Sequence, residues 1–273
     1  MEELKDKKFI AKFAEVEPKL QQLYIEGSLP AGPYLTVVGP RKPSIYAVRV
    51  INQFISRVAP YCTIVSGLAY GVDVLALQTA VNGGGKILSI CPTGVKNIQP
   101  PAHQNFITYV LNNEKGAVVS EYISVGSVYK SLFLLRNRLL AAVGDVVFAP
   151  EASFKSGTHN TLKHALDLNR VIATVPAEIY SQTHELTNKL ISIGAQVVLH
   201  PDDLLSLMNI QVKTKKGDSK YAPLVAVIKG GEFEPSVILD KLNISVGDFA
   251  SLIIEAEAER IIQRDQDGRI MLV

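Results

Sequence analysis

Two turns that follow predicted strands carry residues suited to binding an anion. Residues 35–42 and residues 62–73 each run from an apolar stretch into a glycine-bearing turn and then toward a predicted helix. Such a turn directs backbone N–H groups and a helix N-terminus toward one point, which favours negatively charged ligands. Arg41 and Lys42 add full positive charges at the first turn. The pattern predicts that a phosphorylated ligand binds where the two turns meet.

The predicted ligand contacts of these turns are Gly39, Arg41, Lys42, Ser66, Gly67, Leu68, Ala69 and Gly71. A guanidinium such as that of Arg41 can hold a phosphate through two parallel hydrogen bonds. Ser66, Gly67 and Gly71 are small enough for the backbone to approach an anion closely, although glycines also serve tight packing of a strand on a helix. Asp73 would repel a phosphate, so we expect it to satisfy backbone N–H groups or to orient a basic side chain.

Two later segments add candidate anion contacts. Arg136 and Arg138 are two residues apart, so they point to different faces of a regular helix. We expect one of them to reach the ligand and the other to pair with an acid such as Glu121 or Glu151, while Asn137 hydrogen-bonds a loop backbone. A further set of anion contacts is predicted at the start of another helix: Lys155, Ser156, Gly157 and Thr158.

These turns belong to a repeating pattern of short strands and helices. The predicted strands are residues 35–39, 62–66, 86–91, 117–120, 146–149, 171–175 and 196–199. Their apolar runs are continuous rather than alternating, which fits strands covered on both faces. The alternation of strands and helices predicts an α/β fold with a doubly wound, Rossmann-like parallel sheet. Because such sheets bind ligands at the carboxyl ends of their strands, the turns there are the expected site.

The chain divides into four predicted parts. They are a helical lead-in (1–34), a Rossmann-like binding domain (35–210), a solvated linker (211–223) and a small C-terminal domain (224–273). The linker is predicted from its lysine-rich, polar composition. In the last part we expect helices at 224–229, 235–242 and 246–259, then a hairpin with its turn at Asp267-Gly268. That order resembles a winged helix-turn-helix.

Composition indicates a globular protein. The hydrophobic fraction is 47 %, but no apolar run reaches the roughly 18 residues of a membrane span. The first residues lack the apolar core of a signal peptide, and Cys62 and Cys91 lie in apolar runs, so we expect buried thiols in a reducing cytoplasm. Residues 31–200 hold 14 Lys or Arg and 8 Asp or Glu. An anionic partner would therefore bind the central domain.

The sequence motifs of several enzyme classes are missing. The chain contains no Walker A sequence, no Gly-x-Gly-x-x-Gly after a strand and no Gly-x-Ser-x-Gly. His159 and His164 are five residues apart, so they do not share a helix face, and no Cys-x-x-Cys occurs. We therefore expect no metal site, no cofactor and no catalytic residues.

Eight motifs, in this order, resemble the DNA-processing protein A (DprA/Smf) family from about residue 18 to residue 195. They are Val38-Gly39-Pro40-Arg41, Ser66-Gly67-Leu68-Ala69-Tyr70-Gly71-Val72-Asp73, Ser120-Glu121, Phe133-Leu134-Leu135-Arg136-Asn137-Arg138, Glu151-Ala152, Lys155-Ser156-Gly157-Thr158, Val175-Pro176 and Asn188-Lys189-Leu190-Ile191-Ser192-Ile193-Gly194-Ala195. Each alone is common, whereas their order and spacing together are specific. The chain is a divergent member, since it departs from the family pattern at Pro40, Tyr70, Leu77, Pro92, Leu134 and Ala177.

The resemblance implies a cytosolic protein that binds single-stranded DNA and helps load the RecA recombinase onto it in natural transformation. It also implies a homodimer formed through the Rossmann-like domain, and no established catalytic activity. Two alternatives remain: a lysine-decarboxylase-like (LOG) enzyme that cleaves the N-glycosidic bond of nucleoside monophosphates, and a sensor of a free nucleotide. Residues 149–153 lack the Pro-Gly-Gly-x-Gly-Thr run of LOG-type enzymes, which favours the DNA-binding interpretation.

The C-terminal domain is not expected to bind DNA. A winged helix that binds duplex DNA places its third helix in the major groove, where phosphates favour a basic surface. The helix predicted at 246–259 carries Asp248, Glu255, Glu257 and Glu259 and no Lys or Arg. We therefore expect this domain to contact a protein or to regulate. Ile253 and Ile254 would face the partner or form the domain's own core.

Overall fold

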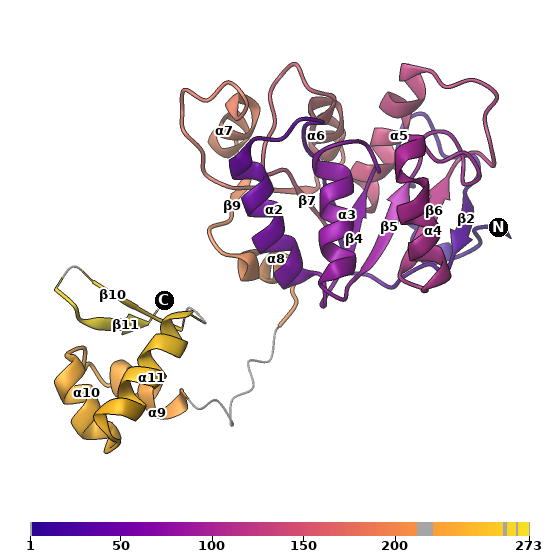
Figure 1. The fold of residues 1–273 in the computed structure, drawn as a ribbon. Helices are drawn as coiled ribbons and strands as arrows, with labels where there is room; N and C mark the ends of the chain where they lie inside the picture. The colour runs from indigo at the N-terminus through magenta and orange to yellow at the C-terminus, as the bar shows by residue number, and fades with distance from the viewer. Residues whose placement is uncertain (1, 212–220, 259–260, 266, 273) are drawn as a thin grey trace. The chain divides into compact units, whose positions relative to one another are not determined.

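The computed structural model of the protein describes residues 2–211, 221–258, 261–265 and 267–272. The chain forms two compact units, Met1–Gln211 and Val212–Val273, which are described separately (Figure 1). Most of the linker expected at 211–223 lies outside the described residues.

The large unit is built on a sheet with the strand order β1-β2-β6-β5-β4-β3-β7-β8-β9. Its parallel strands are β3 (Tyr34–Val37), β4 (Thr63–Ser66), β5 (Lys86–Ile90), β6 (Gly116–Ser120), β7 (Val146–Phe148), β8 (Val171–Thr174) and β9 (Gln196–Val197). Every residue of β3, β4 and β6 is buried, which explains their continuous apolar runs. The prediction of a mostly parallel α/β fold is confirmed, with strand ends within two residues of those expected.

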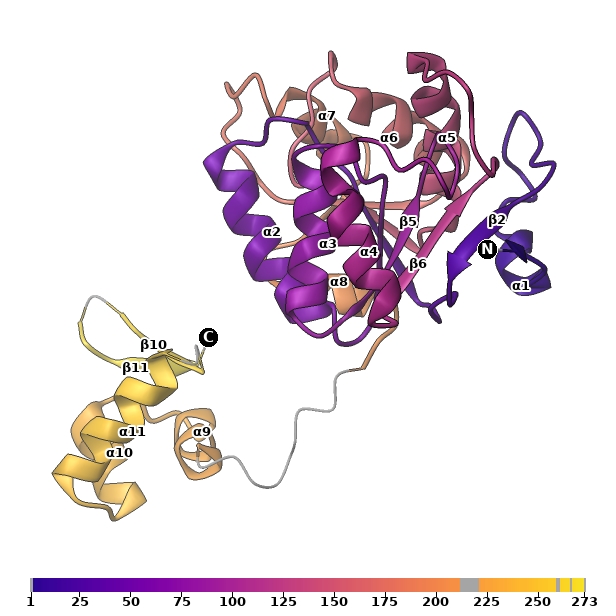
Figure 2. The ribbon, with the colours of Figure 1, turned by 45° about the vertical axis from the view of Figure 1, so that its right-hand side comes forward.

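The order of the strands creates a switch point beside β3. The chain adds β4, β5 and β6 on one side of β3 and then returns to add β7, β8 and β9 on the other. Helices α2 (Ile45–Val58), α3 (Val72–Asn82) and α4 (Gln104–Asn112) cover one face, while α5 (Lys130–Val143) and α6 (Gly157–Asp167) cover the other (Figures 1 and 2). The loops after β3 and β7 therefore diverge to opposite faces, and a crevice for ligands opens between them.

Helix α2 is fixed over the middle of the sheet. Its N-terminus is capped by Ser44, whose Oγ accepts a hydrogen bond from the backbone N–H of Ala47. The ring of Phe54 stacks on that of Phe148 in β7, with centroids 5.8 Å apart. Both the N–H and the Oγ of Ser44 also donate to Glu151, each at 2.8 Å. The turn after β3 is thereby tied to the loop after β7.

The N-terminal segment differs from the expected helical lead-in. It contains α1 (Lys7–Ala11) but also β1 (Glu2–Glu3) and β2 (Tyr24–Gly27), and β2 pairs antiparallel with β6. Strand β2 has four residues, of which only Ile25 is buried, so it leaves no apolar run in the sequence. Its backbone hydrogen bonds to β6 come from a segment about ninety residues away, which a local pattern does not reveal.

Three elements complete the large unit at the end of its chain segment. Helix α7 (Glu185–Ser192) lies between β8 and β9, and α8 (Pro201–Leu207) follows β9. The guanidinium of Arg57, on α2, donates to both carboxylate oxygens of Asp202, on α8, at 2.9 and 3.2 Å. This exposed pair accompanies the packing of α8 against α2.

The small unit contains the elements expected from the sequence. They are α9 (Ala222–Lys229), α10 (Pro235–Leu242), α11 (Val246–Ala258), β10 (Ile262–Arg264) and β11 (Ile270–Leu272), the two strands pairing antiparallel. Leu224, Ile238, Ile253 and Ile270 form the centre of its core. Ile253 is therefore a core residue, whereas Ile254 is 64 % exposed. The winged-helix likeness of this unit stays a prediction.

Both cysteines are buried and free. Burial raises the pKa of the Cys62 thiol to about 12, so it is neutral and unreactive at pH 7. Within the part of the chain that the structure describes, no group of three or more His, Cys, Asp or Glu is placed to hold a metal ion. None of the described helices is long and apolar enough to cross a membrane.

Candidate functional site

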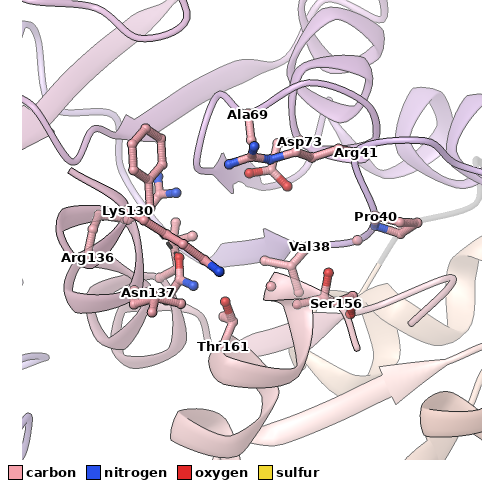
Figure 3. A pocket seen from close by; sticks show the side chains of 16 residues that line it. Val38, Pro40, Arg41, Ala69, Asp73, Lys130, Arg136, Asn137, Ser156 and Thr161 are labelled. Atoms are coloured by element: carbon pink, nitrogen blue, oxygen red, sulfur yellow. Dashed lines mark hydrogen bonds between the residues drawn. The ribbon is translucent and has the colours of Figure 1, made fainter. Parts of the chain in front are cut away.

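A pocket of about 400 Å³ opens at the switch point of the sheet (Figure 3). The turn after β3, the turn after β4 with the start of α3, and the N-terminal parts of α5 and α6 form its walls. Its lining residues are Val38, Gly39, Pro40, Arg41, Ala69, Asp73, Lys130, Phe133, Leu134, Arg136, Asn137, Leu140, Ser156, Gly157, Thr158 and Thr161. The pocket thus lies at the two glycine turns that the sequence singled out.

The two glycine turns pack directly against each other. Gly71 has φ +78°, and a Cβ there would lie 2.6 Å from the backbone carbonyl of Arg41. Gly39 is equally confined, because its Cβ would lie 2.5 Å from the side chain of Val72. Only glycine fits such positions without moving the neighbouring turn. The close approach that these glycines permit is between two parts of the protein.

Ser66, Gly67 and Leu68 do not line the pocket. The Oγ of Ser66 donates to the carbonyl of Val37 at 2.7 Å. A Cβ on Gly67 would lie 2.6 Å from the Cζ of Arg136. Leu68 is fully buried at φ +61°, and its carbonyl lies 2.9 Å from Nδ1 of His103. The sequence left two roles open for this turn, close approach to an anion or tight packing of a strand on a helix. The observed contacts match the packing role.

Arg41 and Lys130 supply the exposed positive charges of the pocket. Arg41 lies at the turn after β3, with its guanidinium carbon 5.8 Å from the ring centroid of Phe133 on α5. Lys130 is the first residue of α5. Both side chains enter the pocket, from different walls (Figure 3). Lys42 is also exposed, but it does not line the pocket.

Arg136 is a buried cation in the wall of the pocket. It is 4 % exposed, and its guanidinium donates to the carbonyls of Gly67, at 2.8 Å, and Ile90. Burial lowers the pKa of Arg136, and the nearby Asp73 carboxylate opposes that shift. Both of these bonds come from Nη1, while Nε donates to Oδ1 of Asn137 at 3.3 Å. Arg136 therefore contributes charge and shape to the site while it holds the turn after β4 in place.

Asp73 is a buried carboxyl group close enough to this cation to interact with it electrostatically. It is 6 % exposed and belongs to the first turn of α3. Burial raises the pKa of Asp73 to about 6, while Arg136 and the backbone of Ala69 and Gly67 act in the opposite direction. The expectation that Asp73 orients a basic side chain is consistent with this arrangement. The net charge of the pocket thus depends on the protonation of Asp73 near pH 6.

Arg138 pairs with an acid, as the sequence predicts for one of the two arginines, whereas Asn137 differs from its predicted role. The side chain of Arg138 is 2 % exposed and forms two hydrogen bonds with Glu121, at 2.6 and 2.8 Å. It lies outside the pocket, so Arg138 is not one of the candidate anion contacts that the pocket brings together. Asn137 does line the pocket, but it donates to the side chain of Asn160 on α6 rather than to a loop backbone.

The N-terminus of α6 forms the wall opposite the glycine turns. Ser156 is its N-cap residue but makes no capping hydrogen bond with its side chain, because its Oγ donates to the carbonyl of Ser153 at 2.8 Å. Gly157 and Thr158, in the first turn, line the pocket. The positive end of the helix dipole is therefore directed at the cavity. Lys155 is exposed on the adjoining surface beside Lys130 and Lys163, outside the main pocket.

The sequence interpretation missed the face of α5 that lines the pocket. Lys130, Phe133, Asn137 and Leu140 line it together. Their spacings of three, four and three residues place them on one helix face. Counting back four and seven residues from Asn137, a predicted site residue, identifies Phe133 and Lys130. Taken together, two exposed cations, a helix N-terminus and a buried arginine equip the pocket to bind an anion.

Comparisons of the sequence with known proteins match one family. The family model described as DNA recombination-mediator protein A matches residues 2–209. The DNA processing protein DprA of Streptococcus pneumoniae is 30 % identical over 174 residues, which cover 64 % of this chain and 61 % of the relative. Protein Smf of Escherichia coli is 32 % identical over 186 residues, or 67 % of this chain and 50 % of the relative. The chain spans about half to three fifths of the length of these relatives.

Two solved structures share the fold. The crystal structure of DprA from Streptococcus pneumoniae has a TM-score of 0.66 and 29 % identity, covering 71 % of this chain and 69 % of that chain. DNA processing protein A from Helicobacter pylori has a TM-score of 0.67 and 24 % identity, covering 76 % and 95 %. The Helicobacter structure is described as giving insight into a single-stranded DNA binding mode.

Proposed function

Because the chain belongs to the DNA recombination-mediator protein A family, we propose that it binds single-stranded DNA through the pocket at the switch point. The observation that carries this proposal is the convergence of Arg41, Lys130 and the N-terminus of α6 on one cavity. Guanidinium, ammonium and helix N–H groups are the donors that phosphate prefers. A backbone phosphate of the DNA would lie among them.

A single strand suits this pocket better than a duplex. A cavity of about 400 Å³ can admit one nucleotide of a flexible strand. A duplex would have to expel a nucleotide from its stack first, which costs a few kcal/mol. The single-stranded DNA binding mode described for the Helicobacter pylori relative supports the same choice of ligand.

The family also supports a finer role. We propose that the protein loads the RecA recombinase onto single-stranded DNA in natural transformation, as a homodimer in the cytoplasm. In this role it is a binding protein rather than an enzyme. Family membership supports these statements, and the pocket supports only the DNA contact.

A free mononucleotide is a second candidate ligand, because the volume of the pocket lies in the range of small-molecule sites. The LOG-type enzyme is not proposed. Residues 149–153 are the segment compared above with the catalytic loop of LOG-type enzymes. Within this segment, Glu151 is 1 % exposed and accepts two hydrogen bonds from Ser44. That carboxylate holds the start of α2.

The test is a titration of the protein into labelled oligo-dT, followed by competition with AMP and with duplex DNA of the same length. We expect saturable binding of oligo-dT that the duplex displaces poorly. Displacement by AMP at concentrations near those of the oligonucleotide would favour the nucleotide sensor. No binding of oligo-dT at low salt would refute the proposed function.

A further inference from the structure

Exposed aromatic side chains gather at the same edge of the large unit as the pocket. Among the described residues of this unit, the exposed aromatic side chains are Tyr46, Tyr61, Tyr70, Tyr109, Tyr129, Phe154 and Tyr180. All except Tyr61 and Tyr109 lie in loops or first helical turns beyond the carboxyl ends of the strands. Exposed aromatic residues scattered over a surface are ordinary. Their concentration at the ligand-binding edge calls for an explanation.

Three of them are close in sequence to residues that line the pocket. Tyr70, Tyr129 and Phe154 are 50, 63 and 47 % exposed, and each lies within two residues of one that lines the pocket. They come from three different segments: the turn after β4, the residue before α5 and the loop after β7. The three rings therefore belong to segments that form different walls of the pocket.

Two of these rings are held by neighbouring histidines. Tyr70 makes a T-shaped contact with His103, with ring centroids 5.0 Å apart, and Phe154 makes one with His159 at 5.8 Å. A T-shaped contact occupies one edge or one face of a ring, so at least one face stays open. A ring that is already positioned loses little conformational freedom when a ligand stacks on it.

Each of two rings is also followed directly by a cation. Lys130 follows Tyr129, and Lys155 follows Phe154, both on exposed surface. A stacking ring beside a phosphate contact matches the alternation of base and phosphate along a nucleic-acid strand. The core of a protein–protein interface, by contrast, is depleted of charged residues such as lysine. The mixture of rings and cations favours single-stranded DNA as the occupant.

We propose that Tyr70, Tyr129 and Phe154 are base-stacking residues, which hold the nucleotides next to the one whose phosphate enters the pocket. This inference rests on the proposed function and adds the contacts that would hold bases. Because every base has a π-face, the binding they provide is tolerant of sequence. Stacking releases no counterions, so it contributes affinity without salt dependence.

The protein contains no tryptophan, so one introduced residue is a unique fluorophore. The variants Tyr70→Trp, Tyr129→Trp and Phe154→Trp are titrated with oligo-dT and with an abasic oligonucleotide of the same length. Tyr109→Trp is the matched control, because Tyr109 is 51 % exposed on α4, away from this edge. We expect oligo-dT to quench the fluorescence of the first three variants and not of the control, and the abasic strand to quench none.

Affinity provides the second readout. Each of Tyr70→Ala, Tyr129→Ala and Phe154→Ala is expected to weaken oligo-dT binding about fivefold or more, with the salt slope unchanged. Tyr129→Phe should retain wild-type affinity, and Tyr109→Ala should have no effect. Thermal unfolding of each variant checks that it folds.

The outcomes separate this inference from the proposed function. If wild-type protein binds oligo-dT but the Trp variants stay unquenched and the Ala variants bind normally, the stacking inference is wrong and the DNA-binding proposal stands. If the wild type does not bind oligo-dT, both fail. Tyr129→Ala could instead abolish self-association and leave DNA binding intact. In that case Tyr129 contacts another copy of the chain, and the stacking role is overturned.

Discussion

Arg41 and Arg138 both come from motifs expected to bind phosphate, yet their surroundings differ. Arg41 is exposed and lies over the ring of Phe133. Arg138 is buried, and Glu121 accepts two of its hydrogen bonds. An exposed guanidinium keeps its donors for a ligand, whereas one paired in the interior has none to spare without leaving a buried carboxylate unpaired. Residue type and spacing do not distinguish these cases, but the contacts do.

At the residue scale, we predict that Arg41→Ala weakens binding of oligo-dT at least tenfold, about 1.4 kcal/mol. A charge-assisted contact to phosphate contributes about that much. The unfolding free energy should hardly change, because the side chain is exposed and forms no salt bridge that the structure records. Fluorescence anisotropy and urea unfolding measure the two quantities. Lys42→Ala is the control, an adjacent cation outside the pocket, and equal losses in both variants would contradict the placement of the phosphate.

A second residue-scale prediction concerns Asp73, whose pKa is raised from 3.8 to about 6 by burial. Because the unfolded chain releases this proton at lower pH than the folded protein, the stability linked to neutral Asp73 is complete below about pH 4. It is lost as pH rises through about 6. Between pH 5 and pH 7 the wild type should therefore lose more unfolding free energy than Asp73→Asn.

Urea unfolding of both proteins at the two pH values measures this difference. Burial lowers the pKa of His164 and His184, but both histidines are present in wild type and variant alike. Their contributions cancel in the comparison. Identical pH dependence in the two proteins would show that Asp73 does not titrate there.

At the scale of elements, two helices form the pocket together with the glycine turns. The first turn of α6 and one face of α5 form much of the wall. Gly67 and Gly71 instead give space to Arg136 and to the turn after β3. The exposed N-terminal end of a helix has free N–H groups for a ligand, whereas the glycines serve contacts within the protein.

Helix α11 supports a prediction about the small unit. It carries Asp248, Glu255 and Glu257, and no Lys or Arg, while Glu259 lies outside the described residues. Glu257 pairs with Arg264 at 2.7 Å, which offsets part of this negative charge. A helix with three described acidic residues and no basic one still disfavours contact with a polyanion. Truncation after residue 210 should therefore leave the affinity for a labelled oligonucleotide nearly unchanged, provided that circular dichroism shows a folded protein. Loss of most of the affinity would show that the small unit contacts DNA.

At the scale of the whole molecule, charge is distributed unevenly along the chain. Residues 31–200 hold 14 Lys or Arg and 8 Asp or Glu, whereas residues 201–273 hold 9 and 12. The pocket lies in the basic part. Long-range attraction of an anion therefore favours the large unit.

This distribution predicts a strong effect of salt. Each phosphate contact on a single strand contributes about −0.7 to the slope of log affinity against log salt concentration. We expect a clearly negative slope for oligo-dT, less negative by about 0.7 in Arg41→Ala, and tighter binding of single strands than of duplexes at every salt concentration. Titrations of single strands and duplexes at several salt concentrations, from low to physiological, measure the slope and the preference. A flat dependence, or a preference for duplex, would contradict phosphate-dominated binding.

The sequence by itself determined the seven parallel strands and the edge of the sheet where the pocket opens. Fully buried strands leave continuous apolar runs, and the turns after them are marked by glycine, so both signals are local. Tertiary structure decided the rest. It paired β2 with β6, directed Arg138 to Glu121, and brought one face of α5 beside the turn that holds Arg41. Those outcomes depend on partners far apart in the chain, whose burial and charge pairing exist only after the sheet has assembled.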